Sequence, residues 1–532
     1  MSVTTHWRLY AAGAALAVGA LFGDVAAPAW AQQASKSTFT IATRLTDSKF
    51  DPALHFQELD AVDVINVYEP LVFPVKGGVP RPHLATAWKV SDDGKVWTFT
   101  LRDGVKFHDG KPLTARDVAY SMDRMLSIKK GYSSLWAGIL TVGGARAIDD
   151  RTVQFTLDKP FGPFIETLVQ FYVVNSELLK ANQKPGDFGA NGDYGQAYLQ
   201  NADAGSGPYK LDTLVPDRRR VLVKFDDYRA GWTPQHYDRI VIEIVGETAT
   251  ARNLLTGGQV NFVDQWQPVD FYKNVAKEKG VRVNEAPDNK LYLVQMNTRK
   301  APFDDPNFRK AVLHAFDYKT ANDVILGGAE QARGPVPSAM PGYDASTPAY
   351  QQNLPLAREY LAKSKYKPDQ IELNFNYIKA GAHDEMALLL QSNLKQIGIP
   401  MKITVEQWPT LSGNAAKPDT APHFFPVYNT AKYPTPDAYT FAMYHPASHG
   451  QWQAAAHYDN PAVTKLLEEA RGAADPAVRN GKYAQATKLI VDDAASLWVG
   501  YTVHRVALSD SVKNYESKGL MAFDLYVHDL RH

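Results

Sequence analysis

The stretch between residues 84 and 126 constrains the fold more than any other part of the sequence. Its central segment, residues 95–102 (KVWTFTLR), alternates apolar and polar side chains, which is the pattern of a strand with one buried face. Asp103-Gly104 follows, a dipeptide typical of a tight hairpin turn, so we expect the chain to return at once as a second strand. Residues 114–117 (TARD) then have the spacing of a capping box at the start of a helix. The stretch therefore predicts a small unit of mixed strands and helix.

The rest of the chain also mixes short strand and helix patterns. Strand patterns occur at residues 38–43, 152–157, 221–225, 240–244 and 401–405, and helix patterns occur at residues 249–255, 305–316 and 384–397 and after Asn460-Pro461 and Asp475-Pro476. The chain has 532 residues, which suggests three or four domains at about 150 residues each. No repeat and no Gly/Ser-rich tether separates them, so we expect an α/β protein whose domains exchange strands and chain crossovers.

The first residues have the pattern of an export signal. Residues 9–23 form an apolar run, Arg8 precedes it, and residues 29–31 (AWA) match a signal-cleavage site. The run is too short to span a bilayer as a helix. We therefore expect cleavage before Gln32, with an uncleaved anchor as the alternative, and export to the periplasm of a Gram-negative bacterium or to the medium.

Composition excludes several functional classes. The chain contains no cysteine, which excludes a thiol nucleophile, a cysteine-bound metal and a lipid anchor on cysteine. Its 57 basic residues balance its 57 acidic residues, so we expect neither a nucleic-acid partner nor an anionic membrane surface.

Catalytic signatures are missing from the sequence as well. It contains no H-E-x-x-H, no G-x-S-x-G, no Walker loop and no G-x-G-x-x-G after a strand. Residues 205–209 (GSGPY) resemble a nucleophile elbow only superficially, because proline stands where the motif needs glycine, and we interpret them as a turn. Acidic pairs such as Asp304-Asp305 fit turns and helix caps better than a catalytic dyad. We expect no catalytic residue and no cofactor, with a secreted hydrolase as the alternative class.

One histidine cluster contains His445, His449 and His457. A spacing of four residues can place two imidazoles on one helical face for a metal, but Pro446 and Gly450 would interrupt a helix here. We expect a polar loop and no metal site, with a contact between His449 and a small ligand as the alternative.

Residues 84–126 closely resemble the signature of the family 5 solute-binding proteins of ABC importers, the dipeptide, oligopeptide and nickel-binding group. Four further segments resemble the same family in the family's order: residues 205–209 (GSGPY), 254–264 (LLTGGQVNFVD), 297–316 (NTRKAPFDDPNFRKAVLHAF) and 327–343. The resemblance extends from about residue 38 to about residue 510, nearly all of the chain after the export signal.

The resemblance implies an α/β fold of the periplasmic-binding-protein type (type II-like, cluster C), a two-lobed clamshell with an extra small α+β domain. The expected division is a signal peptide at 1–31, lobe one at 32–64, 175–290 and 500–532, the small domain at 65–174, and lobe two at 291–499. Such a clamshell encloses its solute by a ligand-biased equilibrium between open and closed states. The resemblance also implies a monomeric periplasmic receptor that delivers its solute to the permease and ATPase subunits of an ABC importer in the inner membrane. A sensor partner for chemoreceptors is the alternative role for this fold.

The expected ligand class depends on residues 428–436 (YNTAKYPTP). In peptide-binding members of the family, an aspartate in a similar segment pairs with the α-ammonium of the peptide. Lys432 stands in place of that aspartate here, and Asn429 stands in place of a common aromatic residue. A buried lysine would repel an ammonium and favour a carboxylate, a phosphate or another anionic group. Asp437 takes the aspartate's role if the alignment shifts.

The nickel-binding members offer a second comparison. They lack the same aspartate and carry a histidine a little further on, a role that His449 or His445 fits. The resemblance adds four ligand-side candidates: Arg44 and Thr46 after the first strand, Tyr292 on a crossing strand, and Tyr428. We therefore expect a bound solute, most simply a peptide, with an opine-like anion, an oligosaccharide or a nickel chelate as the alternatives.

Overall fold

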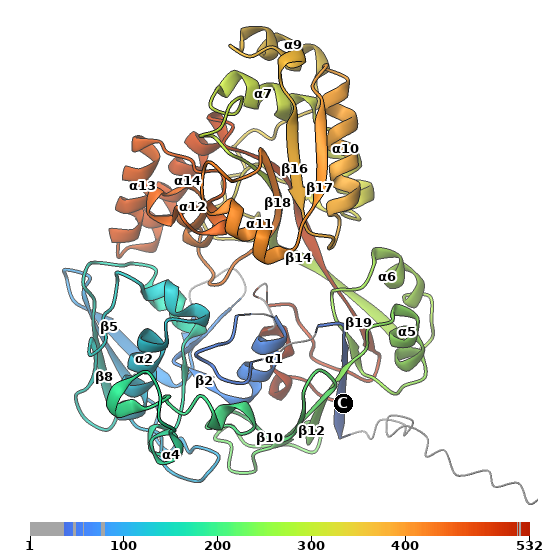
Figure 1. Cartoon of the computed structure of the whole chain (residues 1–532). Helices are drawn as coiled ribbons and strands as arrows, with labels where there is room; N and C mark the ends of the chain where they lie inside the picture. The colour runs from blue at the N-terminus through green and yellow to red at the C-terminus, as the bar shows by residue number, and fades with distance from the viewer. Residues whose placement is uncertain (1–36, 46–48, 57, 76–79, 519, 521–522) are drawn as a thin grey trace, which may run out of the picture.

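Two lobes, one above the other, make up the protein (Figure 1). The computed structural model describes residues 37–45, 49–56, 58–75, 80–518, 520 and 523–532, so the expected export signal lies outside the described residues. Two long antiparallel strands, β14 (Val281–Met296) and β19 (Ser496–Ser509), run from one lobe into the other. Their register breaks between Pro287 and Leu291, and we name this segment the hinge segment. Within the described residues, no helix is long and apolar enough to cross a bilayer.

Lobe one, the lower half in Figure 1, contains strands from distant parts of the chain. The first strand, β1 (Thr38–Thr43), lies inside the main sheet, parallel to both β12 (Arg239–Ile244) and β13 (Phe262–Val263). β13 in turn pairs with β19, so segments from both ends and the middle of the chain complete one sheet. The other elements of this lobe are α1 (Glu58–Val67), β10 (Tyr209–Val215), β11 (Arg219–Lys224), α5 (Thr248–Thr256) and α6 (Val269–Val275).

The small domain has its own four-stranded sheet, in the order β5-β6-β8-β7. The strands are β5 (Ala85–Val90), β6 (Val96–Leu101), β7 (Ala145–Ala147) and β8 (Thr152–Thr156), and α2 (Ala115–Ile128) packs against the last two. Short elements complete the domain and its border with lobe one: β2 (Glu69–Pro70), β3 (Val72–Phe73), β4 (Arg81–Pro82), α3 (Phe164–Thr167), β9 (Tyr172–Val173) and α4 (Ser176–Asn182). The apolar face of β6 is buried at Trp97 and Phe99, and Thr114 with Asp117 forms the predicted capping box.

The prediction of a hairpin after Asp103-Gly104 is wrong. Gly104 does turn, with a φ of +69°, but residues 105–107 form no strand. β6 already has β5 on one edge and β8 on the other, so no edge is left for an immediate return strand. A long-range partner therefore overrides the local turn signal.

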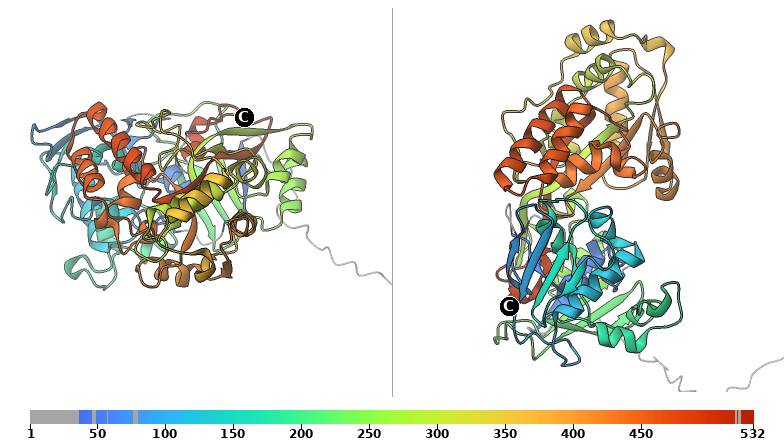
Figure 2. Two further views of the ribbon diagram at one scale, coloured as in Figure 1. Left: turned by 90° about the horizontal axis from the view of Figure 1, so that it is seen from above. Right: turned by 90° about the vertical axis from the view of Figure 1, so that its left-hand side faces the viewer.

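Lobe two continues the main sheet through β14-β18-β16-β17 and surrounds it with helices. Its elements are β15 (Glu330–Gln331), β16 (Leu373–Tyr377), β17 (Met401–Val405), β18 (Phe424–Thr430), α7 (Pro306–Ala315), α9 (Leu354–Lys363), α10 (His383–Lys395), α11 (Trp408–Ala415), α12 (Asp437–Tyr444), α13 (Pro461–Gly472) and α14 (Pro476–Asp492). Asp305, Asn460 and Asp475 cap α7, α13 and α14 with side-chain oxygens, as the cap-plus-proline patterns predict. The side view in Figure 2 shows α13 and α14, in red, directly above the blue and teal small domain.

Residues 205–208 are buried and bend at Gly207-Pro208 into β10, which begins at Tyr209 as the sequence predicts. A Cβ atom on Gly205 would lie 2.0 Å from the carbonyl oxygen of Val67, so only glycine allows this approach of backbone to backbone. The neighbouring Ser206 is buried, and its hydroxyl donates a hydrogen bond to Glu69 Oε2 at 3.0 Å.

We expect Gly205→Ala to lower the free energy of unfolding by about 1–3 kcal/mol, because the added methyl group must displace the Val67 backbone. Thermal and urea denaturation measure this loss. Gly246→Ala is the matched control, since nothing lies within 4 Å of a Cβ at that position. Equal stabilities of the two variants would contradict the packing argument.

Candidate ligand-binding site

Lys432 lies where the two lobes meet. It follows β18 of lobe two, and its Nζ lies 4.1 Å from the ring centroid of Phe56 and 5.9 Å from that of Tyr132, both in the lower half of the molecule. Its backbone oxygen accepts a hydrogen bond from Gln170 Nε2 at 2.7 Å. The lower half therefore contacts Lys432 through both its side chain and its backbone.

The ammonium of Lys432 forms no ion pair with any acidic side chain that the structure describes. Burial lowers the pKa of Lys432 to about 8, because desolvation disfavours the cation and no carboxylate of the described residues offsets that loss. The faces of the two aromatic rings attract a cation, by about 0.5–2 kcal/mol. A half-buried cation on aromatic rings, with no counter-ion among the described side chains, is suited to receive the anionic group of a ligand.

Tyr292 and Tyr428 are cross-strand neighbours on β14 and β18. Their rings meet edge to face with centroids 4.8 Å apart, and the Tyr292 hydroxyl lies 2.9 Å from His383 Nδ1. Burial lowers the pKa of His383 to about 4, so this imidazole is neutral at neutral pH. Its Nδ1 can then accept a hydrogen bond from the Tyr292 hydroxyl. Tyr292 is fully buried and packs against Tyr428, whereas Tyr428 is only partly buried.

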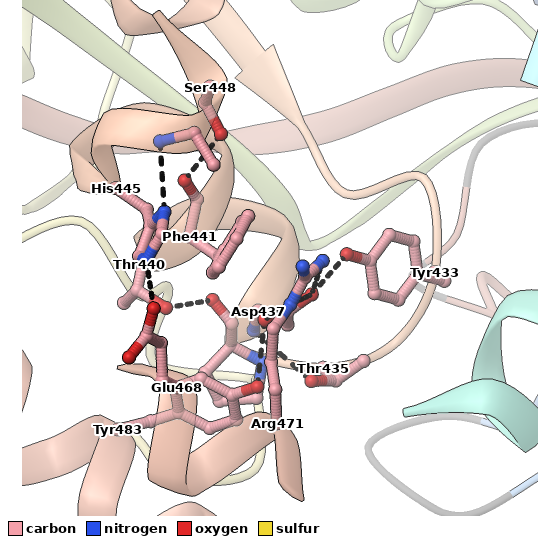
Figure 3. A network of polar contacts seen from close by, with 12 residues as sticks. Tyr433, Thr435, Asp437, Thr440, Phe441, His445, Ser448, Glu468, Arg471 and Tyr483 are labelled. Atoms are coloured by element: carbon pink, nitrogen blue, oxygen red, sulfur yellow. Dashed lines mark hydrogen bonds and ion pairs between the residues drawn. The ribbon is translucent and has the colours of Figure 1, made fainter. Parts of the chain in front are cut away.

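Asp437 is enclosed within lobe two (Figure 3). Its fully buried carboxylate pairs with Arg471, with Nε at 2.9 Å and Nη2 at 3.0 Å, and accepts hydrogen bonds from the hydroxyls of Tyr433 at 2.7 Å and Tyr483 at 2.8 Å. Burial opposes its ionisation, but Arg471 and the two tyrosines outweigh that effect and hold the pKa of Asp437 below its ordinary value. Because these groups already engage both oxygens, Asp437 is an internal anchor, and the structure does not support the role expected for it under a shifted alignment.

The histidine cluster is packed into its own surroundings. His449 Nε2 lies 3.0 Å from the backbone oxygen of Tyr458, and His445 stacks on Phe441 with ring centroids 4.0 Å apart. The rings of His449 and His457 are 5.6 Å apart. In the described part of the chain, no three His, Cys, Asp or Glu side chains are placed to hold a metal ion. A ligand contact by His449 stays a prediction.

The remaining candidates lie on both sides of the hinge. Asn429 on β18 is buried, and its Nδ2 has no hydrogen-bond partner among the described residues, so it has a donor to offer. Arg44 is exposed directly after β1, and its backbone N–H donates to Asp264 at 3.1 Å. Thr46 lies outside the described residues. The ligand contacts of these three residues stay predictions.

Sequence reasoning missed a polar network beside the hinge. Glu58 accepts hydrogen bonds from Gln265 Nε2 at 2.8 Å and from Trp266 Nε1 at 2.9 Å. Lys290, inside the register break of β14, donates to Gln265 Oε1 at 2.8 Å, and its Nζ lies 4.9 Å from the Trp266 ring centroid. Burial raises the pKa of Glu58 to about 7, with Lys290 acting in the opposite direction. No local pattern marks these residues, since only the fold brings them together.

Two cavities in the described structure lie away from Lys432. One of about 630 Å³ lies between β10, β11, β12 and α5, and one of about 320 Å³ lies around His108 and Asp203 at the border of the small domain. None of the ligand-side residues expected from the sequence lines either cavity.

We expect Asp437→Asn to lower the free energy of unfolding by about 3–5 kcal/mol at pH 7, because Arg471, whose side chain is only 19% exposed, is left without its counter-charge. Since the folded protein holds the pKa of Asp437 below its ordinary value, the carboxylate stabilises the wild type above about pH 4. That contribution is lost as the pH falls through the lowered pKa, so the variant and the wild type should converge in acid. Chemical denaturation at several pH values measures both effects. Asp459→Asn, which breaks the exposed pair with Arg299, is the control, and an equal loss there would contradict the anchor role.

Comparison with known proteins identifies the family. Residues 79–451 match the family described as bacterial extracellular solute-binding proteins, family 5. The probable D,D-dipeptide-binding periplasmic protein DdpA of Escherichia coli K12 is 32% identical over 443 residues, which cover 81% of each chain. Among solved structures, the fold is similar to the periplasmic binding protein DppA of Helicobacter pylori in complex with the peptide STSA (TM-score 0.77, 24% identity, 93% of this chain and 98% of that one). It is also similar to AgaA of A. tumefaciens R10 in complex with agropinic acid (TM-score 0.75, 21% identity, 93% and 98%). The chain belongs to family 5 of the bacterial extracellular solute-binding proteins, as its sequence signature indicates.

Proposed function

We propose that this solute-binding protein works in the periplasm as a monomer and delivers its solute to the permease and ATPase subunits of an ABC importer. We further propose that the solute carries a free carboxylate and is most simply a short peptide. The names of the relatives support a peptide, since the similar E. coli protein is described as D,D-dipeptide-binding. Membership of the solute-binding family supports capture and delivery of a solute.

One observation favours a carboxylate, namely the charge of Lys432. Its ammonium lies at the junction of the lobes without an acidic partner among the described side chains. A ligand carboxylate placed there gains a charge-assisted hydrogen bond, and it also relieves the cost of burying an unpaired cation. A ligand ammonium at the same place meets a like charge. The proposed peptide therefore binds with its carboxyl end, or an acidic side chain, toward Lys432.

An opine-like acid is the second candidate, because the same cation would suit it. AgaA, which shares the fold, was solved with agropinic acid. A nickel chelate and an oligosaccharide complete the set of ligand classes expected from the family. Neither of these two requires an unpaired cation at the junction of the lobes.

A ligand panel tests the proposal. The purified protein is heated with di- and tripeptides, D,D-dipeptides, the same peptides as carboxyl-terminal amides, opine-like acids, oligosaccharides and nickel chelates. A ligand at 100 times its Kd stabilises the folded state by about 2.7 kcal/mol, so a true ligand raises the melting temperature in a concentration-dependent way. We expect peptides with a free carboxyl group to do so and their amides to do so weakly. Stabilisation by oligosaccharides or nickel chelates alone would contradict the proposal.

Replacing Lys432 should separate stability from binding. We expect Lys432→Met to stabilise the ligand-free protein by about 2 kcal/mol at pH 7, allowing for the partial exposure of the side chain, because the variant buries no charge. Between about pH 8 and pH 10.5 the unfolded wild type holds this proton more tightly than the folded one, so the wild type gains stability as the pH rises and the difference closes.

The same substitution should weaken binding of the free acid at least tenfold and leave binding of the amide nearly unchanged. In the wild type, affinity for the acid should fall as the pH rises above about 8, where Lys432 loses its proton. Calorimetric titrations with an acid and amide pair measure this. Lys465→Met, an exposed lysine of the same lobe, is the control. An unchanged preference for acid over amide in Lys432→Met would refute the role of Lys432.

A further inference from the structure

Lobe two touches the small domain at a second place, far along the sequence from the hinge. The N–H of Gly162 donates to the backbone oxygen of Arg471 at 2.7 Å, and Glu166 on α3 forms a buried ion pair with Arg479 on α14. Gln170 donates to the backbone oxygen of Lys432, as described above. All three contacts originate in residues 161–170, which we name the clasp segment.

We propose that the clasp segment holds the lobes closed over a bound solute, so that closure depends on a contact opposite the hinge as well as on the hinge strands. This inference rests on the proposed function, since it assigns the small domain a part in ligand capture. The arrangement of the lobes agrees with it, because α13 and α14 lie directly above the small domain in both Figure 1 and Figure 2.

Gly162 packs directly against the backbone of lobe two. A Cβ atom there would lie 2.2 Å from the carbonyl oxygen of Ala473 and 2.9 Å from Arg479 Nη1. The φ of Gly162 lies outside the left-handed region, so alanine is compatible with the local backbone. The atoms nearest to the added methyl group, those of Ala473 and Arg479, all belong to lobe two.

The ion pair in the clasp is buried but incompletely satisfied. The side chains of Glu166 and Arg479 are each 4% exposed, and within the described residues Glu166 Oε2 and Arg479 Nε have no hydrogen-bond partner. Burial raises the pKa of Glu166 despite the attraction of Arg479, so the cost of removing water exceeds the gain from pairing. Such a pair gives little net adhesion by itself. The ion pair favours one arrangement of lobe two on the small domain. The pair separates when water hydrates the two charges again.

The clasp segment also contacts the surroundings of Asp437 and Lys432. Arg471, which holds Asp437, has its guanidinium carbon 4.9 Å from the Phe161 ring centroid and 3.3 Å from that of Phe441. Together with the Gln170 contact to Lys432, this joins the clasp segment to the loop that carries the proposed ligand-binding cation. Seating of lobe two on the clasp segment thus fixes the position of Lys432.

Distance measurements between spin labels test the clasp. The chain has no cysteine, so Ile148→Cys in the small domain and Lys465→Cys in lobe two introduce the only two thiols. Both positions are exposed, at 59% for Ile148 and 78% for the Lys465 side chain. Pulsed electron-spin resonance gives the distance distribution without ligand and with excess trialanine. We expect a short-distance population in the labelled parent, enlarged by trialanine.

Gly162→Ala should shift this distribution to longer distances and weaken trialanine binding at least tenfold, mainly through faster dissociation. Gly472→Ala is the matched control, because it adds a methyl group beside Ala473 with nothing within 4 Å. Glu166→Gln provides a second test that adds no bulk, with Glu177→Gln, which breaks an exposed pair with Lys111, as its control. We expect Glu166→Gln to shift the distribution in the same direction as Gly162→Ala, because Arg479 is then buried without a counter-charge when the lobes are closed. Ligand-free melting curves verify that each variant is folded.

Identical distance distributions for Gly162→Ala and its control, or a parent that shows only separated lobes with and without trialanine, would overturn the clasp. If trialanine leaves the melting temperature of the parent unchanged, the peptide proposal loses its support. In that case the distance distributions of the parent and of Gly162→Ala, measured without ligand, still test whether the clasp segment holds the lobes together.

Discussion

The pairing of β14 with β19 is the contact on which the rest of the structure depends. Both strands belong to one sheet that extends through both lobes, so neither lobe is complete without them. Hydrogen bonds along a ladder resist separation but allow twist, and the register break between Pro287 and Leu291 relaxes the ladder where the lobes join. Lys290 lies inside this break, next to the network of Glu58 and Trp266. The geometry of these two strands therefore sets how the lobes are joined beside Lys290.

The buried charges of this protein fall into two kinds. Asp437 has partners for both oxygens, and its lowered pKa reflects a folded state that stabilises the charge. Lys432 and Glu166 have pKa values shifted against their charged forms, because burial costs more than their neighbours return. The first kind holds a lobe together. The second kind lies at contacts between the lobes, where a charge that is poorly compensated in one state can be compensated by a ligand or by water in another.

The sequence predicts local elements well where a pattern is complete within a few residues. The caps at Asp305 and Asn460, the capping box at Thr114 and the buried alternation of β6 all depend on neighbours close in sequence. The prediction of a return strand after Asp103-Gly104 was wrong, because β5 and β8 occupy both edges of β6. The family signature indicated the two-lobed fold, since a long motif carries information that propensities do not.

The candidate site was harder to predict, because its contacts join distant parts of the chain. Lys432 was identified from a comparison of segments, but nothing near it in sequence indicated that Phe56 would lie 4.1 Å from its ammonium. Asp437 stood in the expected region, and only its contacts with Arg471 and two tyrosines show that it is already engaged. Local sequence can indicate the type of charge, whereas the partner of that charge is decided by the fold.

The interior position of β1 has a consequence for how the chain is made. Residues 38–43 are synthesised some two hundred residues before their partners in β12 and β13, and β19, which pairs with β13, follows later still. Contacts between residues so far apart in sequence form slowly, because the chain loses the entropy of loop closure before the contact contributes any stabilising free energy. Lobe one therefore cannot complete its sheet during synthesis of the first half of the chain. The sheet of lobe one therefore cannot close before β19 has been synthesised.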